Sequence, residues 1–374
     1  MRKILVSTLI IFNTVLIAQT KVFGAVMSAK EKVRGMRIFL LLSVGVILVA
    51  GLSAQSLGQG GTGEGSAGLH ADGTIYTWGK NIYYGQLGNG SKSDSSTPVR
   101  VLKGVYSGTT YLGDDILNKV TMIAVGGNHS LALVEDGTVY AWGGDGNGQL
   151  GKNTVNSTKT TPVKVLKGAY SGTTYLGDDS SNKIIAVAAG ETHSLALASD
   201  GTVYTWGANS AGELGNNSTT NSSTPVHVVK GAYSGTTYLG DDTDNRITAI
   251  AAGQGFSIVL GTDGTVYAWG GNYSGELGNN STTNSSTPVR VVKGAYSGTT
   301  YLGDDSSNKI IAVEGGVQAS IALATDGTVY AWGHNGNGQL GNNSTTNSST
   351  PVHVVKGAYS GTTYLGDDSS NKIT

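Results

Sequence analysis

The sequence predicts an all-β protein built from a repeated four-stranded unit, and three observations support this prediction. All five tryptophans of the 374-residue chain recur in steps of 63 or 64 residues, within copies of Asp-Gly-Thr-Val/Ile-Tyr-x-Trp-Gly: Trp78, Trp142, Trp206, Trp269 and Trp332. All five prolines keep the same period, each within Thr-Pro-Val. The 58 glycines follow no collagen triplet and separate short β-branched runs. A fixed period of this size indicates a repeat architecture.

The unit at residues 184–229 gives the clearest strand pattern. Residues 184–190 form a short apolar run, and residues 194–198 and 202–206 alternate around Asp200-Gly201, a pair typical of two-residue hairpin turns. A polar loop leads to a fourth strand at 225–229. Four-stranded units repeated radially describe the blades of a β-propeller. We expect five to six blades, and we interpret the chain as a fragment of a seven-bladed ring; a terminal stub that closes the ring is the alternative.

Residue size predicts the place of each strand in the blade. The Ala/Gly-rich strand suits the crowded inner position, and proline at the head of the fourth strand fits an outer edge. We expect the five tryptophans to be structural, each filling the space between blades and contributing about 2–3 kcal/mol by burial.

An inserted segment between successive units carries paired tyrosines around a predicted small hairpin, Tyr-Ser-Gly-Thr-Thr-Tyr. Tyrosine gives a large contact area at low entropic cost, so this ring of hairpins is our candidate binding surface. The alternative is that the tyrosines pack each hairpin onto the neighbouring blade. The candidate residues are Tyr106, Tyr111, Tyr170, Tyr175, Tyr233, Tyr238, Tyr296, Tyr301, Tyr359 and Tyr364.

The chain divides into N-terminal hydrophobic segments at 1–54, a glycine-rich lead-in at 55–71 and propeller repeats at 72–374. Two tandem stretches in 1–54 resemble secretory signal peptides, each with a basic start and an apolar run. We expect Met36 to begin the working signal and cleavage to follow Ala54. An uncleaved anchor is the alternative and the only membrane contact we predict. Both alternatives place the repeats outside the cytoplasm, as a secreted, cell-surface or periplasmic protein.

Composition and motifs argue against several kinds of chemistry. The chain has no cysteine, and residues 55–374 hold 17 basic and 24 acidic residues, which disfavours a nucleic-acid partner. Gly-x-Gly-x-x-Gly matches at 58–63, 146–151 and 336–341 lack a following helix, so we predict no cofactor. The Asp178-Asp179 loop and its copies lack the ligand spacing of a calcium loop, so solvated turns are preferred and we predict no metal. Near-identical units do not gather unlike catalytic residues, so we predict no enzyme.

The repeat resembles the regulator of chromosome condensation repeat family. The similarity rests on Gly127-Asn-His129-Ser130-Leu-Ala-Leu133 with 136–151, on a second copy at 191–215, and on the recurrence of this pattern over 66–356. The resemblance implies a β-propeller, usually of seven blades. This chain departs from the pattern in unit count, in the tyrosine hairpin, and in Phe256 and Ala319, which replace the histidine of the last two units.

These observations predict an exported, bacterial member of this family that acts as a protein-binding or structural scaffold. Its partner is a protein or another macromolecule. The resemblance also allows a second function, guanine-nucleotide exchange on a small GTPase. A third alternative is the repeat portion of a larger exported protein.

Overall fold

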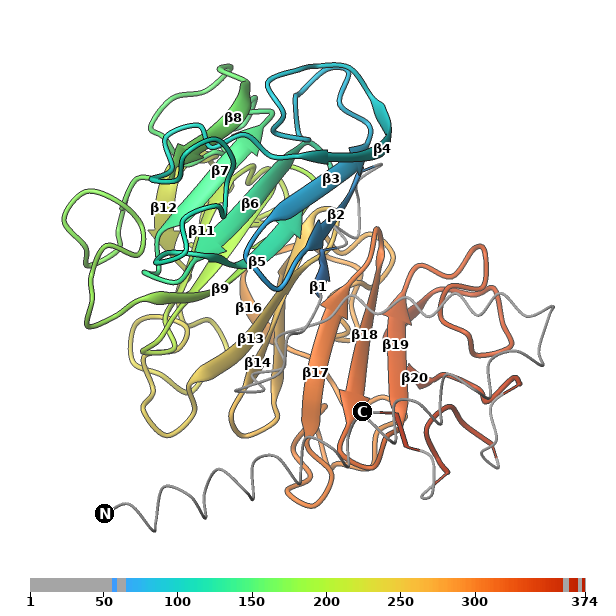
Figure 1. The fold of residues 1–374 in the computed structure, drawn as a ribbon. Coiled ribbons are helices and arrows are strands. Elements are labelled where there is room, and N and C mark those ends of the chain that lie inside the picture. Colours follow the sequence, from blue (N-terminus) through green and yellow to red (C-terminus); the bar gives the residue numbers. More distant parts are fainter. Residues whose placement is uncertain (1–55, 59–64, 359–362, 369–371, 374) are drawn as a thin grey trace, which may run out of the picture. The chain divides into compact units, whose positions relative to one another are not determined.

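The computed structural model describes residues 56–58, 65–358, 363–368 and 372–373. The predicted signal segments at 1–54, and Tyr359 among the candidate tyrosines, lie outside these ranges. All regular structure in the described residues is β-strand, in five antiparallel four-stranded sheets (Figure 1). This part of the chain contains no helix long and apolar enough to cross a membrane.

Each sheet takes four consecutive strands, so every sheet is a simple meander. The first sheet contains β1 (Ser56–Gly58), β2 (Gly65–Leu69), β3 (Ile75–Gly79) and β4 (Ser95–Arg100). The second contains β5 (Val120–Val125), β6 (His129–Val134), β7 (Val139–Gly143) and β8 (Lys159–Lys164). The third contains β9 (Ile184–Ala189), β10 (His193–Ala198), β11 (Val203–Gly207) and β12 (Ser222–His227). The fourth contains β13 (Ile247–Ala252), β14 (Phe256–Gly261), β15 (Val266–Gly270) and β16 (Ser285–Arg290). The fifth contains β17 (Ile310–Gly315), β18 (Ala319–Ala324), β19 (Val329–Gly333) and β20 (Ser348–His353).

The turn between the second and third strands differs in length from the prediction. In the third sheet, Ala198 and Thr202 pair through the Ala198 N–H, 2.9 Å from the Thr202 carbonyl, so the turn has three residues rather than two. Gly201 takes φ +96°, the left-handed geometry that glycine accepts without strain. The Asp200 carboxylate accepts the Thr202 N–H at 2.9 Å, which explains why an aspartate precedes the glycine in every unit.

The proline-bearing strand forms the outer edge of each sheet, as predicted. Pro225 lies inside β12 rather than at its head, because β12 already begins at Ser222. The ladder between β11 and β12 shifts register between Thr205 and Gly207, which leaves Pro225 outside the paired positions. A residue without an N–H is tolerated at such an irregularity on an edge strand.

The first sheet begins within the segment that was expected to be a lead-in. Strands β1 and β2 pair with each other, and β2 pairs with β3 in the same register as in later units: Ser66 lies opposite Trp78, as Ser194 lies opposite Trp206. The repeats therefore start before residue 72. Residues 65–69 read Gly-Ser-Ala-Gly-Leu, so their apolar alternation is too weak to indicate a strand.

The core lies between successive sheets. Trp142, Trp206, Trp269 and Trp332 are completely buried. Trp206 belongs to the same buried hydrophobic cluster as Leu131 of the second sheet, and Trp269 to the same cluster as Leu195 of the third. Trp78, in the first sheet, is half-buried. Each tryptophan after the first thus fills the boundary with the sheet before it.

Candidate functional site

The first tyrosine of each described hairpin is a packing residue. Tyr106, Tyr170, Tyr233 and Tyr296 expose only 2–3% of their surface. The Tyr170 hydroxyl donates to the carbonyl of Asn182, and its ring meets Tyr204 of the next sheet edge to face at 5.5 Å. Burial raises the pKa of Tyr170 to about 12, so the phenol stays protonated and remains a donor. This arrangement corresponds to the packing alternative for these four residues.

The second tyrosine of each pair has exposed surface and stacks on the outer strand. Tyr238 is 36% exposed, and its ring lies parallel to the His227 imidazole at 4.0 Å between ring centres. Arginine takes the histidine position in other units, where Arg100 lies 4.0 Å from the ring centre of Tyr111. The second tyrosines are Tyr111, Tyr175, Tyr238, Tyr301 and Tyr364, and ligand binding by them stays a prediction.

The aspartates of the inserted segment cap the hairpin from within. The Asp178 carboxylate accepts the N–H groups of Thr173, Thr174 and Tyr175 at 2.8–2.9 Å. These hydrogen bonds favour the charged form and help to lower the pKa of Asp178 against the opposing effect of burial. Its oxygens are therefore occupied by the chain itself. In the described ranges no three His, Cys, Asp or Glu side chains are grouped as metal ligands.

A cavity of about 380 Å³ opens at the other end of the sheets from the tyrosine hairpins. The hairpins lie beside the turns between second and third strands; the Leu176 carbonyl, for instance, accepts the Val139 N–H. The cavity is lined instead by turns between first and second strands, such as Glu191-Thr192, and by loops between third and fourth strands, such as 208–213. Antiparallel strands place these two sets of turns at opposite sheet ends.

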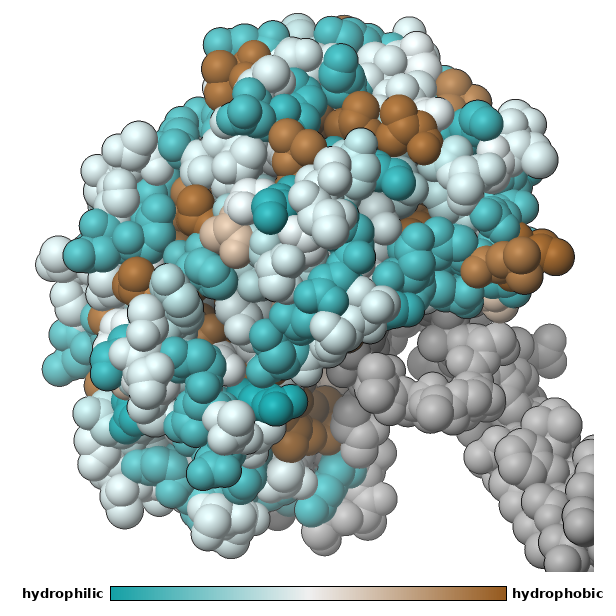
Figure 2. Space-filling view, turned by 90° about the vertical axis from the view of Figure 1, so that its left-hand side faces the viewer, coloured by the Kyte–Doolittle hydropathy of each residue, from teal (hydrophilic) through white to brown (hydrophobic). Residues whose placement is uncertain are grey.

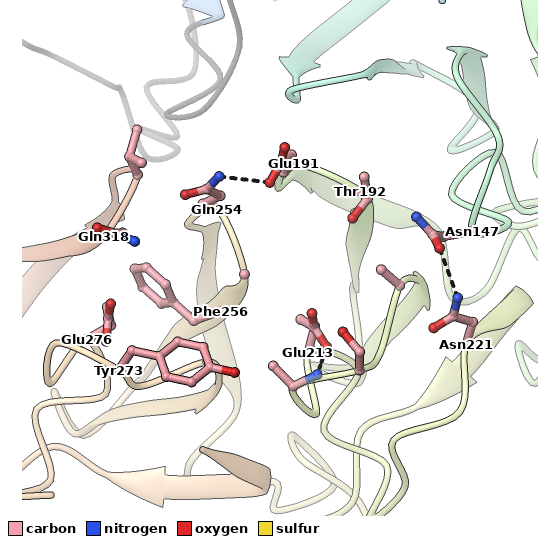
Figure 3. Close-up of a pocket in the computed structure, with 16 residues that line it drawn as sticks. Asn147, Glu191, Thr192, Glu213, Asn221, Gln254, Phe256, Tyr273, Glu276 and Gln318 are labelled. Atoms are coloured by element: carbon pink, nitrogen blue, oxygen red, sulfur yellow. Dashed lines mark hydrogen bonds between the residues drawn. The ribbon is translucent and has the colours of Figure 1, made fainter. Parts of the chain in front are cut away.

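One side of the cavity carries two aromatic rings beside Glu276 and Gln318, and the other side is polar (Figure 3). Phe256 and Tyr273, of the fourth sheet, stand near Gln318 of the fifth. Facing them are Glu191 and Glu213 of the third sheet. Tyr273 is 76% exposed, so its ring forms part of the rim. A volume of this size matches a site for a small molecule or for one side chain of a partner.

The polar side is held by hydrogen bonds between units. The Gln254 side-chain amide donates to the Glu191 carboxylate at 2.8 Å, and the Asn221 amide donates to the Asn147 side-chain oxygen at 3.0 Å (Figure 3). These bonds join the third sheet to the fourth and the second. Because they fix long side chains, the polar wall is organised before any ligand binds.

The cavity is acidic. Its lining includes Glu191, Glu213 and Glu276, and it contains no lysine, arginine or histidine. Burial raises the pKa values of Glu213 and Glu276 above the usual range of a carboxyl group, because desolvation penalises the charged form. A cation in the cavity would offset that penalty, so the arrangement favours a positively charged ligand group.

The turn that Glu213 closes is closed by a glutamine, Gln149 or Gln339, in the second and fifth units. The Glu213 carboxylate accepts the Ala211 N–H at 2.8 Å, and the Gln149 side-chain oxygen accepts the Asn147 N–H at 2.9 Å. Closing the turn therefore requires an oxygen acceptor but no charge. The glutamates at 213 and 276 add negative charge to a conserved geometry, and only in the third and fourth sheets.

The features that the repeats share do not indicate this cavity. The sequence signal for the cavity lies in the positions where one unit differs from the others. Glutamate for glutamine at 213 and 276, Tyr273 at the loop tip and Phe256 in the histidine position all mark this place.

The repeated histidines His129 and His193 are buried packing residues. The His129 Nε2 atom lies 2.7 Å from the Ser194 hydroxyl of the next sheet, and the His193 Nε2 atom lies 3.2 Å from the Ser257 hydroxyl. Burial lowers the pKa of His129 to about 3 and that of His193 to about 4. Both rings are neutral near pH 7 and lie away from solvent.

Five meandering four-stranded sheets with tryptophan wedges define the class: an all-β repeat protein of propeller blades. The chain belongs to the RCC1-like domain family, which matches residues 61–364. The prediction of a regulator of chromosome condensation repeat propeller is thereby confirmed.

Similar proteins include a photoreceptor and a very large ligase. The ultraviolet-B receptor UVR8 of Arabidopsis thaliana is 29% identical over 283 residues, which are 75% of this chain and 53% of UVR8. The human E3 ubiquitin-protein ligase HERC2 is 30% identical over 78% of this chain and 5% of its own length. This chain thus spans about half of UVR8 and a small part of HERC2. Among solved structures, human WBSCR16 superposes with a TM-score of 0.60 at 24% identity, over 78% of this chain and 65% of that chain.

Proposed function

We propose that this chain is an exported bacterial scaffold that binds a protein partner by taking one of its lysine or arginine side chains into the cavity between the third and fourth sheets. The acidic cavity is the observation that carries the proposal. Export rests on the signal-like segments at 1–54. The absence of enzymatic activity and the alternative of nucleotide exchange stay predictions.

Charge and shape both favour a cationic side chain as the occupant. Glu213 and Glu276 supply negative charge in a poorly solvated place, where a charge pair is stronger than in water. Phe256 and Tyr273 supply aromatic faces, on which arginine stacks well. A charged anchor that enters an aromatic-lined pocket is a typical hot spot of protein interfaces.

The surrounding surface suits a protein partner better than a lipid. Figure 2 shows one face of the molecule, where hydrophobic residues form separate small groups within a hydrophilic and neutral surface. Around the cavity the exposed large side chains are Tyr273 and Val317, at 76% and 51%. An amphipathic rim of this kind resembles the aromatic and polar mixture of protein-binding surfaces.

The test is a peptide selection followed by a charge-removing variant. A random peptide library is panned on the wild-type protein, and the enriched peptides are measured by isothermal titration calorimetry. The double variant Glu213→Gln with Glu276→Gln keeps the turn-closing acceptor, because Gln149 and Gln339 occupy this position in two other sheets. We expect enriched peptides to contain arginine or lysine and to lose at least about tenfold in affinity on the double variant.

Two results would contradict the proposal. One is enrichment of peptides without a cationic residue. The other is equal affinity for the wild type and the double variant. A Gln339→Glu variant provides the opposite control, because it adds a carboxylate to the same turn of the fifth sheet, which does not line this cavity, and it should leave the affinity unchanged.

A further inference from the structure

The turn between the first and second strands of the fourth sheet carries a glycine where three other units carry a side chain. Gly255 takes the place of Asn128, Thr192 and Gln318, because the carbonyl of each accepts the N–H that follows the third strand of its sheet. Gly255 lines the cavity, and a Cβ atom there would meet nothing within 4 Å. Its φ lies outside the left-handed region, so the turn itself does not require glycine. The missing side chain therefore leaves open space in the cavity wall.

Two aromatic rings line the cavity at different depths. Phe256 is 2% exposed and forms part of the inner wall, whereas Tyr273 is 76% exposed and forms part of the rim. In the third unit these positions are held by His193 and Ser210. Figure 3 shows both rings on one side of the cavity, across from Glu213. A flat ligand group that enters at the rim therefore contacts an aromatic ring there and another on the inner wall.

Glu213 and Glu276 occupy equivalent loops of neighbouring sheets and are 7% and 3% exposed. The Oε2 atom of each accepts one backbone N–H of its own turn, from Ala211 and from Ser274, at 2.8 Å. A carboxylate can accept hydrogen bonds from several donors, so both groups retain capacity for a ligand. The cavity thus combines two poorly solvated carboxylates with two aromatic rings.

A guanidinium group matches this combination better than an ammonium group does. It is planar and stacks on aromatic faces, and its five N–H donors form a fork that can bond to more than one carboxylate. It is also more weakly hydrated than an ammonium group, so it loses less hydration on entering a poorly solvated cavity. A lysine ammonium is a compact, strongly hydrated charge without a flat face.

We propose that the cavity selects arginine over lysine. The guanidinium group stacks against Phe256 and Tyr273 and donates to Glu213 and Glu276. Gly255 determines this specificity, because a side chain at that position would fill the space that the arginine enters. This inference rests on the proposed function and narrows the anchor of the partner protein from a cationic side chain to an arginine.

The test is isothermal titration calorimetry of the full-length protein with three tripeptides, each carrying an acetyl and an amide cap. Their central residue is arginine, lysine or citrulline between two glycines, and the caps remove the terminal charges. We expect the arginine tripeptide to bind at least about fivefold more tightly than the lysine tripeptide. Citrulline keeps the flat shape without the charge and should bind at least about tenfold more weakly than arginine.

Exchange of residues between units tests the aromatic rim. Tyr273→Ser introduces the residue of the third unit at an exposed site, so the preference for arginine should fall at least about twofold. Tyr83→Ser is the matched control, because Tyr83 is 64% exposed and does not line the cavity. It should keep the wild-type preference.

The same strategy tests the glycine. Gly255→Gln introduces the residue of the fifth unit and should weaken binding of the arginine tripeptide at least about tenfold, because the new side chain occupies the cavity. Asn128→Gln places glutamine in the equivalent turn of the second sheet, outside the cavity lining, and should bind like the wild type. Gly255→Thr, with the residue of the third unit, replaces Gly255→Gln if circular dichroism shows that the latter is unfolded.

The outcomes separate this inference from the proposed function. Equal affinities for the arginine and lysine tripeptides, both weakened on the Glu213→Gln, Glu276→Gln double variant, would overturn the selection of arginine and retain the cationic site. No binding of either tripeptide in the millimolar range would overturn both. Wild-type affinity of a folded Gly255 variant would overturn the role of Gly255 in specificity.

Discussion

The Trp206 indole N–H lies 2.8 Å from the Gln149 carbonyl oxygen, and this hydrogen bond joins the third sheet to the second. The bond is fully buried, and the Ser194 hydroxyl shares its acceptor. The tryptophan therefore contributes both apolar burial and a fixed orientation. From the second sheet on, each Trp-bearing strand depends on the sheet before it for both contributions.

Removing the indole N–H should destabilise the protein less than removing the whole ring. Trp206→Phe keeps most of the packing and leaves Gln149 bonded to Ser194, so we expect a loss of about 1–2 kcal/mol. Trp206→Ala leaves a cavity and should cost about 3–5 kcal/mol. Urea denaturation followed by circular dichroism measures both changes.

Trp78→Phe is the matched control for this prediction, because Trp78 is half-buried and its indole makes no such bond to any residue that the structure describes. We expect Trp78→Phe to lower the urea concentration at the unfolding midpoint less than Trp206→Phe does. Equal shifts for the two variants would show that the hydrogen bond to Gln149 contributes nothing measurable.

Two equivalent glycines should respond differently to alanine. Gly168 has φ +52°, and a Cβ atom there would lie 2.1 Å from the Pro225 carbonyl oxygen. Gly357 has φ +51° but open space around it. Gly357→Ala should cost only the left-handed strain of about 1–2 kcal/mol. Gly168→Ala must also move the neighbouring sheet, so we expect a clearly larger loss in the same urea experiment. A Gly168→Ala protein as stable as the Gly357→Ala protein would contradict the observed close contact.

The buried histidines should make the protein less stable in mild acid. The folded-state pKa of His193 is about 4, below its unfolded value near 6.5, so the unfolded chain binds more protons between these pH values. The free energy of unfolding therefore falls as pH decreases from 6.5 towards 4, by up to about 1.4 kcal/mol per pH unit for this residue. Urea denaturation at pH 7, 6 and 5 measures the free energy of unfolding, which we expect to decrease from each pH to the next.

The chain itself suggests the control for the pH experiment. Phe256 occupies the histidine position in the fourth sheet and is 2% exposed, so His193→Phe should keep the packing. We expect this variant to have a shallower pH dependence than the wild type. An unchanged slope would mean that carboxyl groups alone account for the acid sensitivity.

Alanine substitutions of the two tyrosines of one hairpin should distinguish a packing role from a binding role. Tyr233 is 3% exposed, and Tyr233→Ala removes a buried ring at a cost of about 3–5 kcal/mol. Tyr238 is 36% exposed and loses only its stack on His227, so Tyr238→Ala should cost about 1 kcal/mol. If Tyr238→Ala loses a macromolecular ligand while keeping stability, the predicted binding role of the second tyrosines is supported. If every ligand is retained, that role fails.

The shared features of the units were predictable from sequence because each pattern recurs five times at a fixed period. The Trp wedge, the Asp-Gly turn and the outer proline strand depend on local spacing, which the period makes visible. The first two strands of the first sheet were not predictable, since Gly65–Leu69 becomes a strand through its pairing with Ile75–Gly79 and not through its own propensity. The cavity was not predictable either, because Glu191, Glu213 and Phe256 are distant in sequence and only stacking brings them together.

The Trp206 hydrogen bond joins only neighbouring sheets, and this has a consequence for the evolution of the repeat array. Every hydrogen bond in the set that joins sheets crosses a single boundary, so a whole unit of about 63 residues makes the same contacts wherever it is inserted. Gain or loss of one unit by recombination between near-identical segments would preserve each remaining boundary. A change confined to some units, such as glutamate at 213 and 276, can then specialise one part of the array while the other units carry glutamine at the same position.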